Sequence, residues 1–209
     1  MAETTESLID ELAAVGADAV RRQLVLASAG NLSARIPGTD TFVVTAAGTW
    51  LDRLEPEDFT VMGCDGTVLG GSPRPSSEWK LHARTYQARP DVNSVIHLHP
   101  LTAVVLDACG IEVRLILQDH AFYLRRINRV PFSPNGSDEL ADTSAEASRD
   151  CDVVIIGHHG CSTLGDTISM AYRRALNLEE AARATLMCAT LGNTTATFPP
   201  EALAALHHA

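Results

Sequence analysis

The chain has 209 residues, of which 45% are hydrophobic, and this fits one compact domain with a substantial core, which we expect to span residues 1–209. A formal net charge of −10, without a cluster of basic residues, argues against a nucleic-acid surface, which needs positive charge to neutralise phosphates. The five cysteines are widely spaced, odd in number and free of any CxxC pair, so neither a disulfide framework nor a thiolate zinc site is expected.

The N-terminal segment predicts an amphipathic helix that ends near Ala27. Apolar residues recur along it at helical spacing, at Leu8, Leu12, Val15, Ala19 and Leu26. Acidic residues come before these positions, and the segment has neither a basic region nor an apolar run long enough to span a bilayer. We therefore expect a cytoplasmic protein that does not bind a membrane.

Two β-hairpins are predicted in the next part of the chain. Residues 28–45, SAGNLSARIPGTDTFVVT, predict a loop followed by two strands, with Pro37, Gly38 and Asp40 in the turn between them. Residues 59–71, FTVMGCDGTVLGG, predict a second hairpin, because Asp-Gly is a strong two-residue turn signal. We expect antiparallel pairing in this half of the chain.

Helices and strands alternate in the second half. The segment PSSEWKLHARTYQARP predicts a helix from about Ser77 to Arg89, since hydroxyl residues precede a glutamate and no helix breaker occurs before Pro90. Further predicted elements are a strand at 94–100, a short helix at 101–110, an alternating strand at 111–117, a polar helix at 137–148, a buried strand at 153–156 and a long helix at 166–191. Strands in the middle with helices around them favour a layered α/β domain.

Two pairs of histidines lie at the ends of predicted strands. On a strand, His97 and His99 of SVIHLHP project from the same face, so the two imidazoles can share one ion. An HxH pair alone is equally consistent with buried histidines that only satisfy hydrogen bonds. The strand at 153–156 leads to His158 and His159, of which only one should join the site, because adjacent strand residues face opposite ways. Three neutral imidazoles with an open position suit a catalytic zinc site.

Six motifs occur along the chain in this order: GNLSAR, AAG followed by LEPEDF, DGTVLGG, PSSEWKLH, SVIHLHP and HHG. With these motifs the chain resembles, from about residue 8 to residue 192, the class II aldolase/adducin family. The best-known enzyme type of this family is the L-fuculose-phosphate aldolase, and the scaffold also serves an epimerase, a dehydratase, decarboxylases and non-enzymatic adducins. The resemblance implies a three-layer αβα domain with a largely antiparallel central sheet, assembled as a homotetramer with active sites at subunit interfaces. It also implies zinc or another divalent metal ion, such as manganese or cobalt.

By this resemblance the metal ligands are His97, His99 and the histidine directly before glycine, His159. His158 is then a structural neighbour, with its side chain turned into the opposite layer. Glu78 matches the acid/base glutamate of the family, and a carboxylate in the first turn of a helix near a divalent cation can exchange a proton with a substrate. The alternative is that Glu78 only caps the helix.

The phosphate site of the family combines two turns with serines at a helix start, which together offer amides and hydroxyls to an anion. In this chain the corresponding residues are Gly30, Asn31, Ala47, Gly48, Ser76 and Ser77. Ala47 departs from the family pattern, in which threonine or serine is usual at this position. One lost hydroxyl weakens anion binding by about 1 kcal/mol, so we still expect a sugar phosphate or a related small molecule as substrate.

A second departure concerns the aldehyde side of the reaction. Fuculose-type aldolases carry a tyrosine after the HxH strand that acts from a neighbouring subunit, whereas this chain has LILQDHAFYL there. Gln118, Asp119 or His120 would occupy that region. His120 could relay protons, or it could be an ordinary interface histidine.

Three functions follow from these patterns. The leading hypothesis is a lyase, a zinc-dependent class II aldolase that cleaves a phosphorylated ketose or related hydroxy-ketone into a three-carbon enediolate product and an aldehyde. A Schiff-base route is not expected, because Lys80 is the only lysine and cannot share a helix face with Glu78. The alternatives are a metal-dependent decarboxylase of a 3-oxo acid or its phosphate, and a non-catalytic adducin-like interaction module, which the retained histidines disfavour.

Overall fold

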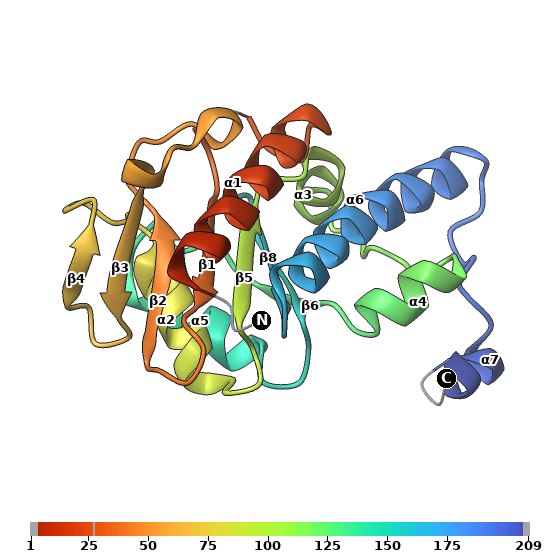
Figure 1. Cartoon of the computed structure of the whole chain (residues 1–209). Coiled ribbons are helices and arrows are strands. Elements are labelled where there is room, and N and C mark those ends of the chain that lie inside the picture. The colour runs from red at the N-terminus through yellow and green to blue at the C-terminus, as the bar shows by residue number, and fades with distance from the viewer. Residues whose placement is uncertain (1–3, 27, 207–209) are drawn as a thin grey trace.

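The computed structural model describes residues 4–26 and 28–206 (Figure 1). Its α-helices are α1 (Thr5–Arg21), α2 (Trp79–Ala88), α3 (Leu101–Ala108), α4 (Gln118–Leu124), α5 (Asp138–Ala147), α6 (Ile168–Thr190) and α7 (Pro200–Leu206), and its short 3-10 helices are η1 (Leu51–Arg53) and η2 (Pro56–Asp58). Its strands are β1 (Asn31–Arg35), β2 (Thr41–Thr45), β3 (Phe59–Gly63), β4 (Val68–Gly71), β5 (Ser94–Leu98), β6 (Asn128–Val130), β7 (Val153–Ile156) and β8 (Gly160–Gly165). None of the described helices combines the length and the apolar character needed to cross a membrane.

In the described residues, eight strands form a mixed central sheet. Their order is β4-β3-β2-β1-β5-β8-β7-β6, and every neighbouring pair is antiparallel except β6 with β7. The predicted α/β class with a largely antiparallel sheet is therefore confirmed. The two predicted hairpins are also confirmed, as β1 with β2 and β3 with β4.

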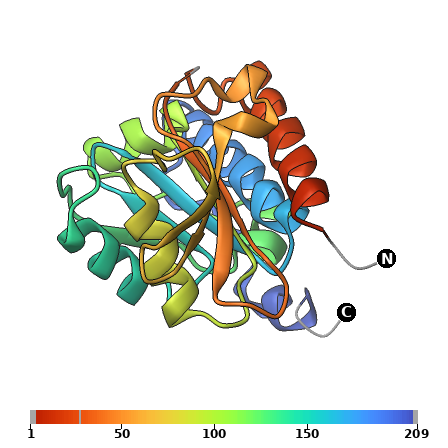
Figure 2. The same ribbon diagram turned by 60° about the vertical axis from the view of Figure 1, so that its left-hand side comes forward.

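Helices cover both faces of the sheet, so the fold has three layers (Figure 1 and Figure 2). α1 and α6 pack on one face, with α3 beside α6, whereas α2 and α5 pack together on the other. The alternation along β2 explains how one strand serves both layers, because Val43 joins the core under α1 while Phe42 and Val44 join the core under α2.

The N-terminal helix is shorter than predicted. α1 ends at Arg21, and Gln23 has a φ of 61°, a left-handed conformation in which a right-handed helix cannot continue. Leu26, which the spacing assigned to the apolar stripe, is 83% exposed. The predicted end at Ala27 lies outside the described residues. The seven-residue spacing from Ala19 to Leu26 spans this turn, so it does not continue the helical repeat.

Residues 111–117 do not form the predicted strand. The alternation itself is real, because Val113 and Leu115 pack against the core between α3 and α6. However, the backbone N–H of Arg114 donates to the hydroxyl of Thr185, and the Arg114 guanidinium donates to the carbonyl of the same residue. These bonds attach the segment to α6 at Arg114, where a strand would instead pair with a neighbouring strand.

The sequence patterns did not predict α4, β6, β8 or α7. β8, GCSTLG, begins and ends with glycine, a residue that is depleted in strands, and β6 is only three residues long. β8 is nevertheless central in the sheet, with β5 on one side and β7 on the other. Pairing with both neighbours stabilises a strand whose own sequence shows little strand preference.

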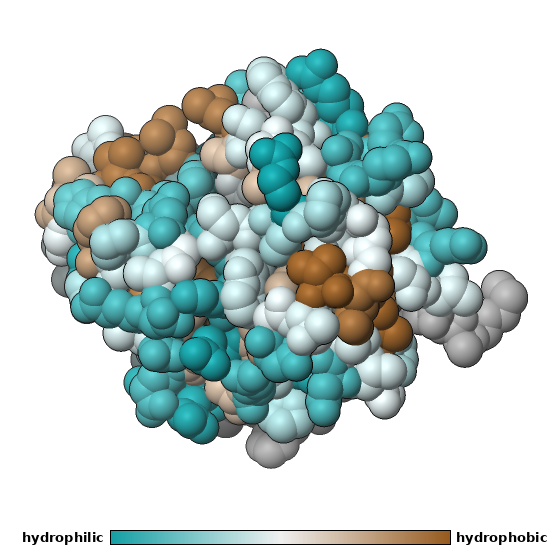
Figure 3. All heavy atoms as spheres, turned by 90° about the vertical axis from the view of Figure 1, so that its left-hand side faces the viewer, coloured by the Kyte–Doolittle hydropathy of each residue, from teal (hydrophilic) through white to brown (hydrophobic). Residues whose placement is uncertain are grey.

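β4 forms one edge of the sheet. The face of the molecule on that side is mostly hydrophilic and is interrupted by separate hydrophobic patches (Figure 3). Val68 and Leu69 of β4 are among the exposed apolar residues. Because β4 is short and ends in two glycines, it offers a poor template for pairing with another chain.

A buried carboxylate fixes the start of α3. Glu179 of α6 accepts hydrogen bonds from the backbone N–H groups of Thr102 at 3.3 Å and Ala103 at 3.2 Å, and from the Thr102 hydroxyl at 2.5 Å. N–H groups in the first turn have no acceptor inside their own helix, and a negative charge there also favours the helix dipole. Glu179 therefore joins α6 to the chain that directly follows β5.

We expect Glu179→Ala to lower the free energy of unfolding by about 2–4 kcal/mol, because it leaves buried N–H groups of α3 without an acceptor. The matched control is Glu180→Ala, since the Glu180 side chain is 63% exposed and its loss should change stability by less than about 0.5 kcal/mol. Urea unfolding of the two variants measures the difference. Equal stabilities would mean that Glu179 does not anchor α3.

Candidate metal centre

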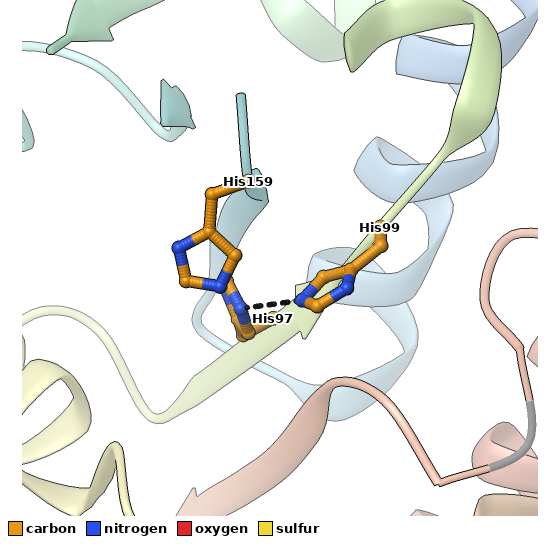
Figure 4. Close-up of side chains that lie close together, drawn as sticks. All are labelled: His97, His99 and His159. Atoms are coloured by element: carbon orange, nitrogen blue, oxygen red, sulfur yellow. Dashed lines mark hydrogen bonds between the residues drawn. The ribbon is translucent and has the colours of Figure 1, made fainter. Parts of the chain in front are cut away.

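Three histidines meet at one end of the sheet (Figure 4). His97 lies in β5, His99 directly follows β5, and His159 lies in the turn between β7 and β8. The pairing of Leu98 with Cys161 places the end of β5 beside the start of β8. One ring nitrogen from each histidine lies within 4.8 Å of the others, and the Nε2 atoms of His97 and His99 are 3.1 Å apart. The structure thus brings together the three histidines that the sequence singled out.

The adjacent histidine does not join this cluster. His158 is exposed and has a φ of 55°, in the left-handed region. The prediction that its side chain turns into the opposite layer is wrong, because residues 157–159 form a turn and not a strand. Strand alternation does not apply to a turn, and the left-handed residue instead directs the chain so that His159 lies inside.

Two glycines allow the cluster to be compact. A Cβ atom on Gly160 would lie 2.5 Å from the carbonyl oxygen of Leu98 and 2.6 Å from the His99 ring. A Cβ atom on Gly30 would lie 2.7 Å from the carbonyl oxygen of His97, and Gly30 also has a φ of 76°. Both positions require glycine, because the neighbouring atoms approach too closely for any side chain.

Burial keeps the three imidazoles neutral. It holds the pKa of His97 well below the usual value, and the neighbouring His99 and His159 add to this effect. Burial, followed by the effect of His159, lowers the pKa of His99 to about 4. Burial also lowers the pKa of His159, against the opposing effect of the Glu78 carboxylate. A neutral imidazole has a free lone pair, which is the form that binds a metal ion.

Several buried atoms here have no hydrogen-bond partner among the described residues. They are both ring nitrogens of His159 and the Oε1 atom of Glu78. Each of these side chains is only 5% exposed, and an unpaired buried polar group costs about 1–3 kcal/mol. A divalent ion held by one nitrogen from each of the three histidines would give one of the two His159 nitrogens a partner. The residues present therefore fit a metal site.

Glu78 lies against the histidine cluster. It directly precedes α2, but its side chain makes no capping hydrogen bond, which counts against the alternative that it serves only as a cap. Its Oε2 atom accepts a hydrogen bond from Nδ2 of Asn31 at 2.8 Å and lies 3.4 Å from Nε2 of His97. Its Oε1 atom lies 3.4 Å from Nε2 of His159. The carboxylate therefore contacts two of the three histidines.

Two of the segments predicted to bind phosphate lie side by side. The backbone N–H of Ala47 donates to the segment before α2, and the backbone N–H of Ser76 donates back to the end of β2, each at 3.0 Å. Gly48 and Ser77 are exposed where these segments meet, and the space around the Gly48 Cα is open. The Ser76 hydroxyl accepts a hydrogen bond from the backbone N–H of Glu78 at 3.2 Å, so this junction lies next to Glu78.

Asn31 is connected to Glu78 rather than left free for phosphate. Its Nδ2 donates to Glu78, and its Oδ1 is hydrogen-bonded to Nε2 of His82. No local pattern could report this contact, since 47 positions separate Asn31 from Glu78. The sequence also did not indicate Ser162, whose Oγ lies 3.4 Å from Nδ1 of His97, because the strand that carries it was not predicted.

His120 does not belong to the histidine cluster of the described chain. Its Nδ1 accepts a hydrogen bond from the backbone N–H of Leu117 at 3.3 Å, and its Nε2 lies 3.7 Å from the Glu180 carboxylate on α6. α4, which carries His120, packs against α6 and α7 (Figure 1). Burial lowers the pKa of His120, despite the nearby carboxylate.

Comparison with known proteins defines the class to which this fold and site belong. Residues 10–186 match the family described as the class II aldolase and adducin N-terminal domain. The chain therefore belongs to the class II aldolase/adducin family.

Named relatives show what kinds of protein this chain is similar to. The L-fuculose phosphate aldolase of Methanocaldococcus jannaschii is 35% identical over 166 residues, which cover 79% of this chain and 88% of that protein. The 3-oxo-tetronate 4-phosphate decarboxylase of Escherichia coli is 27% identical over 187 residues, which cover 87% of each. A solved L-fuculose 1-phosphate aldolase has the same fold, with a TM-score of 0.89 at 24% identity over 99% of this chain and 96% of that chain.

Proposed function

We propose that this protein is a metal-dependent aldolase. It would cleave a phosphorylated ketose or a related hydroxy-ketone into an aldehyde and a three-carbon enediolate product of the dihydroxyacetone phosphate type. The observation that carries this proposal is the buried cluster of three neutral histidines in contact with Glu78. The similarity to an L-fuculose phosphate aldolase supports the type of reaction.

His97, His99 and His159 are the proposed ligands of one zinc ion, or of manganese or cobalt in its place. Three neutral nitrogens with a vacant further position are typical of catalytic zinc sites. When bound, such an ion supplies a Lewis acid that stabilises negative charge on substrate oxygens. The unpaired nitrogens of His159 support its place in this set.

Glu78 is the proposed acid/base. Its Oε2 atom is held by Asn31, whereas its Oε1 atom has no hydrogen-bond partner among the described residues and lies 3.4 Å from Nε2 of His159. The unpaired oxygen can accept a proton from the substrate and return it to the carbon left by cleavage. Lys80 does not compete for this role as a Schiff-base residue, because its Nζ lies 3.0 Å from Asp138, where α2 meets α5.

The proposed phosphate site lies at the junction of the Ala47–Gly48 turn with Ser76 and Ser77. Exposed groups at this junction leave room for an anion, and the absent hydroxyl of Ala47 weakens binding by only about 1 kcal/mol. Gly30 would contribute by allowing close packing on β5. The side chain of Asn31 is engaged by Glu78, so we assign it to the acid/base rather than to the phosphate.

We further propose that the chain is a single domain and works in the cytoplasm as a homotetramer with active sites at subunit interfaces. Exposed apolar side chains on and after α3 support an interface there, namely Leu101, Val105 and Ile111. In such an assembly His120 would act on the site of a neighbouring subunit, since it does not join the histidine cluster of its own chain among the described residues.

A decarboxylase of a 3-oxo acid or its phosphate is the second candidate. It is favoured by the similarity to a 3-oxo-tetronate 4-phosphate decarboxylase over most of both chains. Loss of carbon dioxide and aldol cleavage both leave negative charge on the product, which the same Lewis acid can stabilise and Glu78 can protonate. A non-catalytic adducin-like module is disfavoured, because a protein without a ligand at this site would leave several buried polar atoms unpaired.

Product analysis separates the two enzymatic candidates. We expect the zinc-loaded protein to form dihydroxyacetone phosphate and an aldehyde from a phosphorylated ketose. It should release carbon dioxide from 3-oxo acid phosphates at least about tenfold less efficiently, because only one substrate class should fit the part of the site beyond the histidine cluster. Paired assays with ketose phosphates and 3-oxo acid phosphates measure kcat/KM for each. The reverse preference would identify a decarboxylase.

We expect His97→Ala and His159→Asn to lose the bound metal, because each removes one of three nitrogens. The matched control is His158→Asn, which should keep about one metal ion per chain since this side chain is exposed. Elemental analysis of the dialysed proteins measures occupancy. Full occupancy in His159→Asn together with loss in His158→Asn would contradict the proposed ligand set.

We expect Glu78→Gln to bind metal nearly as well as the unchanged protein but to turn over about 100-fold more slowly or worse, because glutamine keeps the shape and cannot exchange a proton. The variant should also lose solvent-deuterium exchange at the product carbon, which reports proton transfer separately from carbon-carbon cleavage. Exchange and turnover at unchanged rates, with metal in place, would show that another group moves the proton.

A further inference from the structure

A chain of hydrogen bonds lies behind Glu78, on the side away from its unpaired oxygen. From Glu78 it runs through Asn31, His82 and Ser33 to Tyr86. The Ser33 hydroxyl lies 2.6 Å from Nδ1 of His82 and 2.6 Å from the Tyr86 hydroxyl. All five side chains are buried. Within the protein interior such a chain is worth more than its separate bonds.

Side chains from α2, with the residue before it, and from β1 alternate along this series of hydrogen bonds. Glu78, His82 and Tyr86 are four residues apart, so they follow one face of α2 and the residue before it. Asn31 and Ser33 are two residues apart and lie on one face of β1. Each strand residue therefore fits between two helix residues. In the described part of the chain, His82, Ser33 and Tyr86 make no hydrogen bond to the proposed metal ligands.

The contact between Glu78 and Asn31 sets the direction of every bond. A carboxylate only accepts, so Asn31 must present Nδ2 to Glu78 and Oδ1 to His82. His82 must then carry its proton on Nε2 and leave Nδ1 free to accept from the Ser33 hydroxyl. Ser33 in turn accepts from Tyr86. Burial lowers the pKa of His82 to about 3, which agrees with a neutral imidazole that has one donor and one acceptor.

We propose that His82 is a positioning residue for proton transfer, which fixes the side-chain amide of Asn31 and through it the carboxylate of Glu78. The inference rests on the proposed role of Glu78 as acid/base. A reversed amide would place Oδ1 of Asn31 at 2.8 Å from Oε2 of Glu78, and two acceptors at that distance repel each other strongly in a buried site. The Nε2–H group of His82 prevents this reversal. Oε2 is thereby held, and only Oε1 remains to exchange a proton.

Two substitutions at the same position separate positioning from packing. The amide of glutamine in His82→Gln reaches the place of Nε2 and can donate to Asn31, whereas the shorter amide in His82→Asn reaches only the place of Nδ1 and can bond only to Ser33. We expect His82→Asn to lower kcat by about 10–100-fold, while KM and metal content change by less than about twofold. In His82→Gln the decrease in log kcat should be at most about half of that in His82→Asn. Equal losses in both variants, or no loss in His82→Asn, would overturn the proposal.

A second measurement does not depend on turnover. Nitrogen NMR of the full-length, zinc-loaded protein with isotope-labelled histidine should show His82 as the Nε2–H tautomer throughout the neutral pH range, with the signal assigned by its absence in His82→Gln. The Nδ1–H tautomer in a protein that turns over would overturn the positioning chain and leave the proposed function intact. The Nε2–H tautomer in a protein without aldolase or decarboxylase activity would instead overturn the proposed function, and with it the role given to His82.

Discussion

The antiparallel pairing of β5 with β8 is the constraint on which the rest of the site depends. It places the end of β5, with its two histidines, beside the turn that carries His159. β1 pairs on the other side of β5, with Asn31 opposite His97, and so brings Asn31 to the same end of the sheet. Such close approach of three chain segments is possible only because Gly30 and Gly160 have no side chains.

Polar groups on the two sides of Glu78 differ in whether they have hydrogen-bond partners. Behind it, Asn31, His82, Ser33 and Tyr86 satisfy one another through a continuous set of hydrogen bonds. In front of it, Oε1 of Glu78 and both nitrogens of His159 have no hydrogen-bond partner in the described part of the chain. A satisfied network holds side chains in place, and unsatisfied groups in front of it favour binding of a ligand. The division indicates a site that is rigid before anything binds.

The residues of the histidine cluster follow the family resemblance more closely than those around it. The cluster of three histidines, with Glu78 beside it, has all the metal-ligand and acid/base residues that the family resemblance implies. Two places outside this cluster depart from the resemblance, namely Ala47 and residues 118–120, which form the start of α4, a helix that packs against α6. The chain is similar to both an aldolase and a decarboxylase, so the shared fold alone does not select between the two reactions.

Local interactions let the sequence determine a large part of this protein. The Asp65-Gly66 turn predicts its hairpin because turn geometry is set by the residues in the turn, and the spacing of His97 and His99 places both side chains on one face of a strand. The ordered motifs then indicate the family and the layered fold.

The family resemblance already favoured His159 over His158, but only the tertiary structure showed why His159 lies inside: a left-handed turn at His158, and not strand alternation, controls the direction of both side chains. The tertiary structure also decided that residues 111–117 are irregular, since their backbone bonds to Thr185, and that Asn31 serves Glu78. The physical reason is the same in each case. These outcomes depend on partners that are close in space and distant in sequence, which no local pattern of residues can specify.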